Sequence, residues 1–167
     1  MKGQAAMEYL MTYGWALLAI LIVIGALLLL NPFKLPETCT FQQPGLLCSD
    51  PPPTATADAD KVVHISARVW NKLGRTIEVN RILCTTSQGG GIKKEHADPV
   101  SVQISNGDYK DFINIVCKDS SGNDVTGSLN QQFKGSLVLW YQYEEDIANV
   151  DREAIATVVS TVSSSSQ

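Results

Sequence analysis

Four cysteines are the residues of this chain whose type and spacing could do covalent chemistry. Cys39, Cys48, Cys84 and Cys117 all follow the apolar residues 1–30, in a segment that we expect to be exported. An even number of cysteines in an exported segment is typical of disulfides. Three pairings are open. We favour Cys39 with Cys48, because only a short turn-rich loop separates them, which leaves Cys84 with Cys117.

Metal chemistry is less favoured by the residue pattern. No Cys-x-x-Cys motif is present, and neither His64 nor His96 has a zinc-ligand spacing to the cysteines. Asp119–Asp124 places oxygen ligands at alternate positions, as a calcium loop does, but it lacks the glycine at the sixth position and the glutamate at the twelfth. We therefore interpret this segment as a hairpin turn and predict no metal site and no cofactor.

The sequence contains no motif that is typical of catalysis or of nucleic-acid binding. The sequence has no G-x-S-x-G or H-E-x-x-H pattern, so we predict that the protein is not an enzyme. The glycines 89–91 follow no expected strand-to-helix turn, so we predict that they form a loop and not a phosphate-binding site. The net charge is −4 and no run of basic residues occurs, which argues against nucleic acid as a principal partner. His64 is expected to be an ordinary exposed histidine. A group of acids is interpreted as a solvated edge: Glu144, Glu145, Asp146, Asp151 and Glu153.

One long apolar segment precedes everything else in the chain. Tyr9 to Leu30 carries no formal charge, and as a helix it would span about 33 Å, enough to cross a bilayer. A single acid, Glu8, stands just before it. No A-x-A-like cleavage pattern follows the apolar core, so we expect the segment to stay in the mature protein.

The residues around this acid form a recognisable pattern. A basic and a small residue are followed by glutamine, a small residue and glutamate, and then by the apolar run; they are Lys2, Gly3, Gln4, Ala6 and Glu8. This order resembles the class III signal peptide of archaeal type IV pilins and their relatives. Thr12 stands where that family has leucine, and Leu10 is close by.

The resemblance implies a processing step and an assembly role. Residues 1–3 would be a leader, removed by a prepilin peptidase that cuts between Gly3 and Gln4. Residues 4–31 would be a helix that lies first in the cytoplasmic membrane and then in a filament core. Glu8 would neutralise the new amino terminus of its own or a neighbouring subunit. The positive charge of Lys2 agrees with a cytoplasmic start.

The residue composition of the remaining chain changes twice. Residues 32–60 hold six of the seven prolines, and we predict a neck with little regular structure. Residues 61–162 alternate apolar and polar side chains over several short runs, which predicts strands, with a bulge near Arg81, a hairpin at Asn106-Gly107, and both Trp70 and Trp140 in the core. The serine-rich residues 163–167 are expected to be a disordered tail.

These observations lead to one architecture and one leading function. The fold class is α+β: a long hydrophobic helix followed by an immunoglobulin-like antiparallel β-sandwich head. By resemblance, the chain would be a structural pilin subunit of a cell-surface filament of identical subunits that serves adhesion, with the pilus assembly platform as a further partner. Two alternatives remain open: an uncleaved single-pass anchor for the head, and a minor pilin-like binding component of a secretion assembly.

Overall fold

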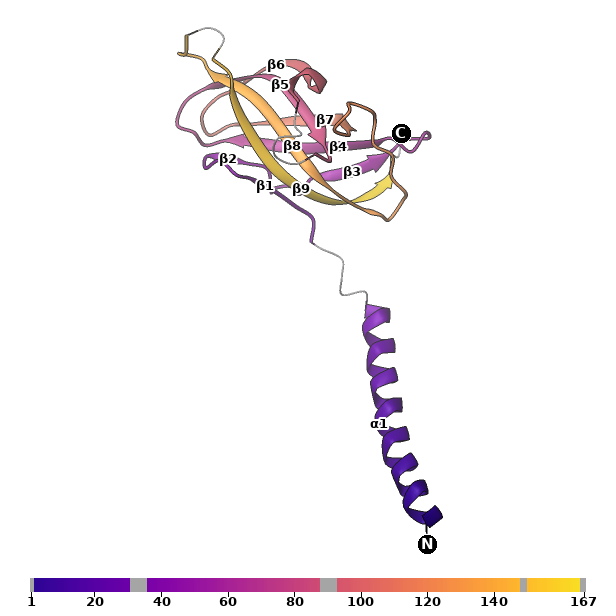
Figure 1. Ribbon diagram of the computed structural model, residues 1–167. Coiled ribbons are helices and arrows are strands. Elements are labelled where there is room, and N and C mark those ends of the chain that lie inside the picture. The colour runs from indigo at the N-terminus through magenta and orange to yellow at the C-terminus, as the bar shows by residue number, and fades with distance from the viewer. Residues whose placement is uncertain (1, 31–35, 88–92, 148–149, 166–167) are drawn as a thin grey trace. The chain divides into compact units, whose positions relative to one another are not determined.

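The computed structural model describes residues 2–30, 36–87, 93–147 and 150–165 (Figure 1). The chain divides into two compact units, residues 1–35 and residues 36–167. The first unit is one helix, α1 (Lys2–Leu30). It covers the helix predicted over residues 4–31, apart from residue 31, which lies outside the described residues. The second unit is a body rich in strands.

Nine strands and one short 3-10 turn make up the described part of the body. In chain order they are β1 (Thr38–Phe41), β2 (Leu46–Leu47), β3 (Thr54–Ala57), β4 (Val63–Asn71), β5 (Ile77–Thr85), η2 (Lys94–His96), β6 (Asp98–Ile104), β7 (Tyr109–Lys118), β8 (Gln132–Tyr143) and β9 (Arg152–Ser164).

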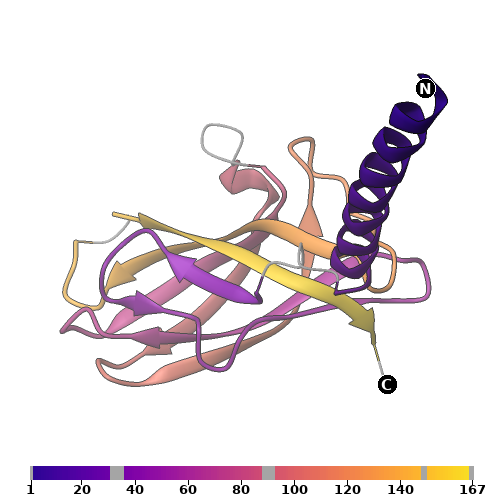
Figure 2. The same cartoon turned by 90° about the horizontal axis from the view of Figure 1, so that it is seen from below.

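Six of these strands form a closed ring. Each strand pairs with the next in the order β9, β3, β4, β7, β5 and β8, and β8 pairs back with β9. The other three strands are attached to this ring: β1 to β9, β6 to β5, and β2 to β4. Figures 1 and 2 show the two longest strands, β8 and β9, running side by side across the body.

The ring closes through two short parallel junctions, which the prediction of an antiparallel arrangement missed. The end of β9 pairs parallel with β3, and the end of β5 pairs parallel with β7. Both β9 and β5 change partners along their length, since β1 and β6 occupy the same edges earlier in these strands. A strand that changes partners in this way turns the corner between two layers and so encloses a core.

The core follows from the period of two in the strands. In β4, every second residue from Val63 to Asn71 is buried, and the inward side chains of Ile65 and Val69 are fully enclosed. In β8, all residues from Gly135 to Tyr141 are buried, because β8 lies between β5 and β9 and is covered on both faces. Trp140 packs on its outer face with Leu83 and Ala97.

The neck and tail predictions were wrong where the structure describes them. From residue 36 onward, the predicted neck belongs to the body and contains β1, β2 and β3. Ala55 and Ala57 are buried in the main core. Ser163 and Ser164, predicted to be disordered, end β9 beside β3, and the amide of Ser165 donates to the carbonyl of Ala57 at 3.2 Å.

Two local predictions had different outcomes. The bulge near Arg81 is confirmed, since the register of β5 against both neighbours shifts between Val79 and Arg81. The hairpin at Asn106-Gly107 was wrong: β6 pairs with β5, whereas β7 pairs with β4 and β5, so this turn carries the chain between layers. Gly107 has a φ of 84°, and its amide donates to the carbonyl of Asn71 at 2.7 Å.

Candidate functional site

The helix α1 has the dimensions of a membrane span. Its segment Met7–Leu29 has 23 residues and a mean hydropathy of 2.3. At 1.5 Å per residue this segment is about 35 Å long, compared with about 30 Å for the hydrocarbon core of a bilayer. Among the described residues, it is the one helix that is long and apolar enough to cross a membrane. This assignment rests on the length and the composition of the helix.

Large apolar side chains cover all sides of α1. Met11, Trp15 and Leu29 expose 76%, 74% and 89% of their surface, and no side chain described in α1 is buried. A helix that is apolar all round is stable only in lipid or among other apolar helices. At about 25 cal/mol per Å² of apolar surface, leaving these side chains in water would cost many kcal/mol. The helix therefore requires a covering that its own unit does not supply.

Glu8 is the one acid in this helix, and it is exposed at the start of the apolar segment. Its backbone carbonyl accepts a hydrogen bond from the hydroxyl of Thr12 at 2.9 Å. Next to it, the rings of Tyr9 and Tyr13 lie 4.3 Å apart. None of the described residues donates a hydrogen bond to the Glu8 carboxylate. A carboxylate at the edge of an apolar segment requires a positive or hydrogen-bonding partner from elsewhere.

The proposed cleavage bond lies within the first turn of α1. Gly3 and Gln4 both have helical backbone, and the side chain of Gln4 is not described by the structure. The first four amide groups of a helix have no partner within it, so this turn is held by fewer backbone hydrogen bonds than the middle of α1. Gln4 and Glu8 are four residues apart and hence lie on the same face of the helix.

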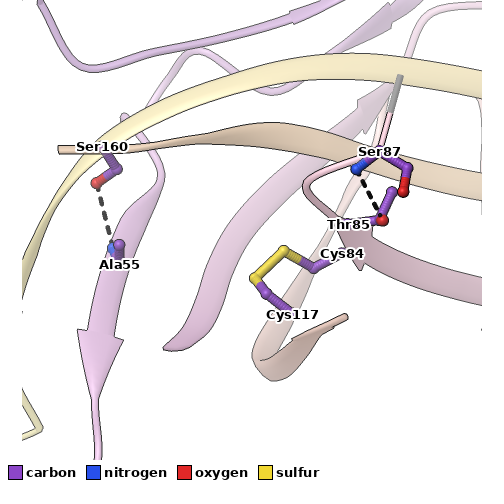
Figure 3. The surroundings of a disulfide bond; sticks show 6 residues. All are labelled: Ala55, Cys84, Thr85, Ser87, Cys117 and Ser160. Carbon is purple, nitrogen blue, oxygen red and sulfur yellow. Dashed lines mark hydrogen bonds between the residues drawn. A yellow bond between two sulfur atoms is a disulfide. The ribbon is translucent and has the colours of Figure 1, made fainter. Parts of the chain in front are cut away.

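The four cysteines form two disulfides with the favoured pairing. Cys39 and Cys48 join β1 to the chain just after β2, with their Cα atoms 5.3 Å apart. Cys84 and Cys117 are partner residues in the parallel junction between β5 and β7, with Cα atoms 4.4 Å apart. The second disulfide thus fixes one of the two junctions that close the ring of strands (Figure 3).

The other junction is fixed by hydrogen bonds instead. Ser160 of β9 is completely buried, and its hydroxyl donates to the carbonyl of Pro53 at 2.9 Å. The same hydroxyl accepts from the amide of Ala55 at 3.2 Å, as Figure 3 shows. Sequence reasoning did not find Ser160, because its partners lie more than 100 residues away in the chain.

The acidic group predicted to be a solvated edge is only partly so. Asp146 pairs with Arg152, and Asp151 pairs with Lys94. The guanidinium of Arg152 also lies 4.5 Å from the centre of the Tyr143 ring. Hydrogen bonding to Arg152 lowers the pKa of Asp146, and hydrogen bonding to Lys94 lowers the pKa of Asp151. Glu144, Glu145 and Glu153 are exposed, as expected.

The segment with calcium-like spacing forms a turn that satisfies its own acid. Oδ1 of Asp119 accepts hydrogen bonds from the amides of Ser121 and Asn123 at 2.8 and 2.9 Å. These donors, with Asn123 first, lower the pKa of Asp119. Lys118 and Asp124 form an antiparallel bridge across the turn, and the amide of Val125 donates to the carbonyl of Cys117 at 2.8 Å, so the predicted hairpin turn is confirmed.

His64 is not the ordinary exposed histidine that the sequence predicted. Its Nε2 lies 3.2 Å from Oδ2 of Asp58, and its Nδ1 is buried without a partner in the described structure. No group of three or more His, Cys, Asp or Glu side chains among the described residues could hold a metal ion.

Trp70 and Arg68 mark an outer face that the sequence did not reveal. Trp70 is only half-buried, unlike Trp140, and its ring lies 4.6 Å from the ring of Tyr109. Arg68 binds Asp111 with two hydrogen bonds of 2.6 and 2.9 Å and stacks over Tyr109. Because these partners come from different strands, only the fold brings them together.

Comparison with protein-family models, with curated proteins and with solved structures finds no match for this chain.

Proposed function

We propose that the chain is a structural pilin subunit of an archaeal type IV pilus-like filament at the cell surface. The observation that carries the proposal is the helix α1, which is apolar on all sides after a single acid, Glu8. In the precursor, lipid would cover this helix. In the filament, the helices of other subunits would cover it, and one surface patch would bind a different patch on the next copy, which generates a helical assembly.

The position of Glu8 suits the proposed processing step. Cutting between Gly3 and Gln4 would create a positively charged amino terminus about 6 Å along the helix axis from Glu8. Because residues four apart share a face, this ammonium group could pair with Glu8 of its own chain or of a neighbour. Such a pair would make it less costly to transfer the carboxylate from the membrane to an apolar filament core.

The body would form the exposed head of the subunit. Two disulfides in the body are compatible with a place outside the cell. The immunoglobulin-like sandwich and a role in adhesion or surface attachment belong to this proposal and rest on the strand pattern and the resemblance.

Replacing Glu8 tests the assembly role directly. We expect Glu8→Ala to leave membrane insertion and the folded body unchanged, and to abolish filaments in electron micrographs of the cell surface. Thr12→Val is the matched control, since it removes a polar group one turn away without changing the charge. Filaments of normal yield from Glu8→Ala would overturn the role given to this residue.

An uncleaved single-pass anchor is the second candidate function. The length of the apolar segment of α1, which matches the thickness of a bilayer, favours it. In that case, the full chain would stay in the membrane and display the body on the surface.

A further inference from the structure

A row of polar side chains crosses three neighbouring strands on the outside of the body. Ser163 of β9 is the partner of Thr56 of β3, and Thr56 is the partner of His64 of β4. One step along, Thr54 of β3 is the partner of Ser66 of β4. Partner residues in a sheet project on the same side, so these side chains share one surface.

This surface is the floor of a groove. The groove has a volume of about 580 Å³, within the range of small-molecule sites. Its lining consists entirely of polar residues: Thr54, Thr56, Asp58, His64, Asn114, Ser163, Ser164 and Ser165. A second hollow of about 510 Å³ shares Asp58, Ser164 and Ser165 with it, so the two form one longer groove.

A bulge in β7 brings Asn114 into this lining. Ile65 pairs with Ile115 and Ala67 with Phe112, so two residues of β7, Ile113 and Asn114, oppose one residue of β4. Asn114 has a φ of 56°, and its amide donates to the hydroxyl of Ser66 at 3.0 Å. Bulges redirect side chains, and left-handed backbone at a residue other than glycine is concentrated at binding sites.

The carboxylate of the groove is held in place and charged. Oδ1 of Asp58 accepts from the amides of Val62 at 2.8 Å and Asp60 at 3.0 Å, while Oδ2 faces His64. The hydrogen bond from Val62, followed by that from His64, lowers the pKa of Asp58. This acid can therefore accept hydrogen bonds from a ligand without first losing a proton.

The lining selects a class of ligand. The residues that line the two hollows include no lysine or arginine, and their two carboxylates, Asp58 and Asp60, repel anions such as phosphate. Hydroxyl and amide groups both donate and accept hydrogen bonds, as a ligand dense in hydroxyl groups requires. The nitrogens of His64 do not serve a ligand directly, because Nε2 faces Asp58 and Nδ1 is buried. We propose that this groove between β9, β3, β4 and β7 binds a neutral saccharide, with Asn114, Asp58 and the hydroxyls of Thr56 and Ser163 as its hydrogen-bonding partners. The hydroxyl of Ser163 donates to the carbonyl of Ala55 at 3.1 Å, so it serves the ligand as an acceptor.

The test is a titration of the isotopically labelled full-length chain in phosphocholine micelles, which contain no sugar. Maltotriose, mannotriose and the trimer of N-acetylglucosamine are the probes. We expect at least one of them to shift the Asn114 amide and His64 ring signals saturably, with a Kd of about 10 mM or tighter. If none of them shifts these signals, the proposal is wrong.

Variants locate the site without unfolding the body. Asn114→Gly removes the amide group but keeps a backbone that glycine adopts readily, and we expect it to weaken binding at least about tenfold. Asn130→Gly is the matched control, because Asn130 also has a positive φ, 64°, and lies outside the groove; it should bind as the wild type does. Equal binding by Asn114→Gly and the wild type would overturn the site.

Saturable shifts of the same signals by calcium but by no sugar would also overturn the proposal. Because binding is measured on single chains, the result does not depend on filament formation.

Discussion

Leu139 in the body is completely buried, whereas Leu29 in α1 exposes 89% of its surface. The body covers its apolar side chains with its own strands, closes its ring at two junctions and fixes one of them with a disulfide. The helix α1 covers none of its described side chains. The body is thus stabilised by its own contacts, whereas the helix depends on contacts with lipid or with other chains. Substitutions in the body should therefore change folding, and substitutions in the helix should change membrane insertion or assembly.

Removing the disulfide at the β5–β7 junction should have the largest effect on the body. The sequence separation between Cys84 and Cys117 is 33 residues, and that between Cys39 and Cys48 is 9. Loop entropy then predicts a loss of about 4 kcal/mol for the double change Cys84→Ala with Cys117→Ala, against about 2.5 kcal/mol for the other pair. Urea unfolding of the full chain in micelles measures both losses. An equal or reversed order would contradict the importance given to this junction, and membrane insertion should not change.

The same substitution in both regions sharpens the comparison. Leu139→Ala leaves a cavity in the core and should lower the free energy of unfolding by about 3 kcal/mol. Leu21→Ala removes an exposed side chain of α1, and the unfolding of the body should change by less than about 0.5 kcal/mol. Its effect should appear instead in filament yield. A large shift in the unfolding of the body by Leu21→Ala would show that the two units are not independent.

Asn71 tests how the turns between the layers are held. It is completely buried; its Nδ2 donates to the carbonyls of Arg75 and Ile104, both at 2.8 Å, and its Oδ1 accepts from the amide of Leu73 at 3.0 Å. Asn71→Ala leaves these backbone groups without a partner and should destabilise the body by about 2 kcal/mol. Asn80→Ala is the control, because its amide bonds only to Asp151 at the surface. Thermal unfolding of both variants decides the point.

Acid should weaken the body and spare the helix. Hydrogen bonds lower the pKa of Asp111, mainly through Arg68, and that of Asp146, mainly through Arg152. A carboxylate whose pKa is lower in the folded state stabilises that state above its unfolded pKa, near 4, and this stabilisation is lost as the pH falls through the folded value. The urea concentration at the midpoint of unfolding should therefore decrease when the pH is lowered below about 4. Asp111→Asn should make that fall smaller. A midpoint that stays constant down to pH 2 would contradict these pairs.

The periodicity of apolar residues predicted much of the secondary structure, but it could not predict which strands pair with one another. The apolar run of α1 and the alternation in β4 are local patterns, so the sequence reveals them directly. The segment 54–57 lies within the predicted neck, because residues 32–60 are rich in proline and in small polar side chains, yet it forms β3 between β4 and the distant strand β9. The candidate site on α1 is likewise local, whereas the groove around Asn114 depends on a bulge and on strands far apart in the sequence.

The intact mass of the protein recovered from its native cell surface tests the central claim most directly. A pilin-type subunit predicts a chain that begins at Gln4, lighter than the full sequence by the residues Met1, Lys2 and Gly3. A chain that still begins at Met1 or at Lys2 would contradict that account. The helix would then be a permanent anchor that holds the disulfide-closed body at the membrane.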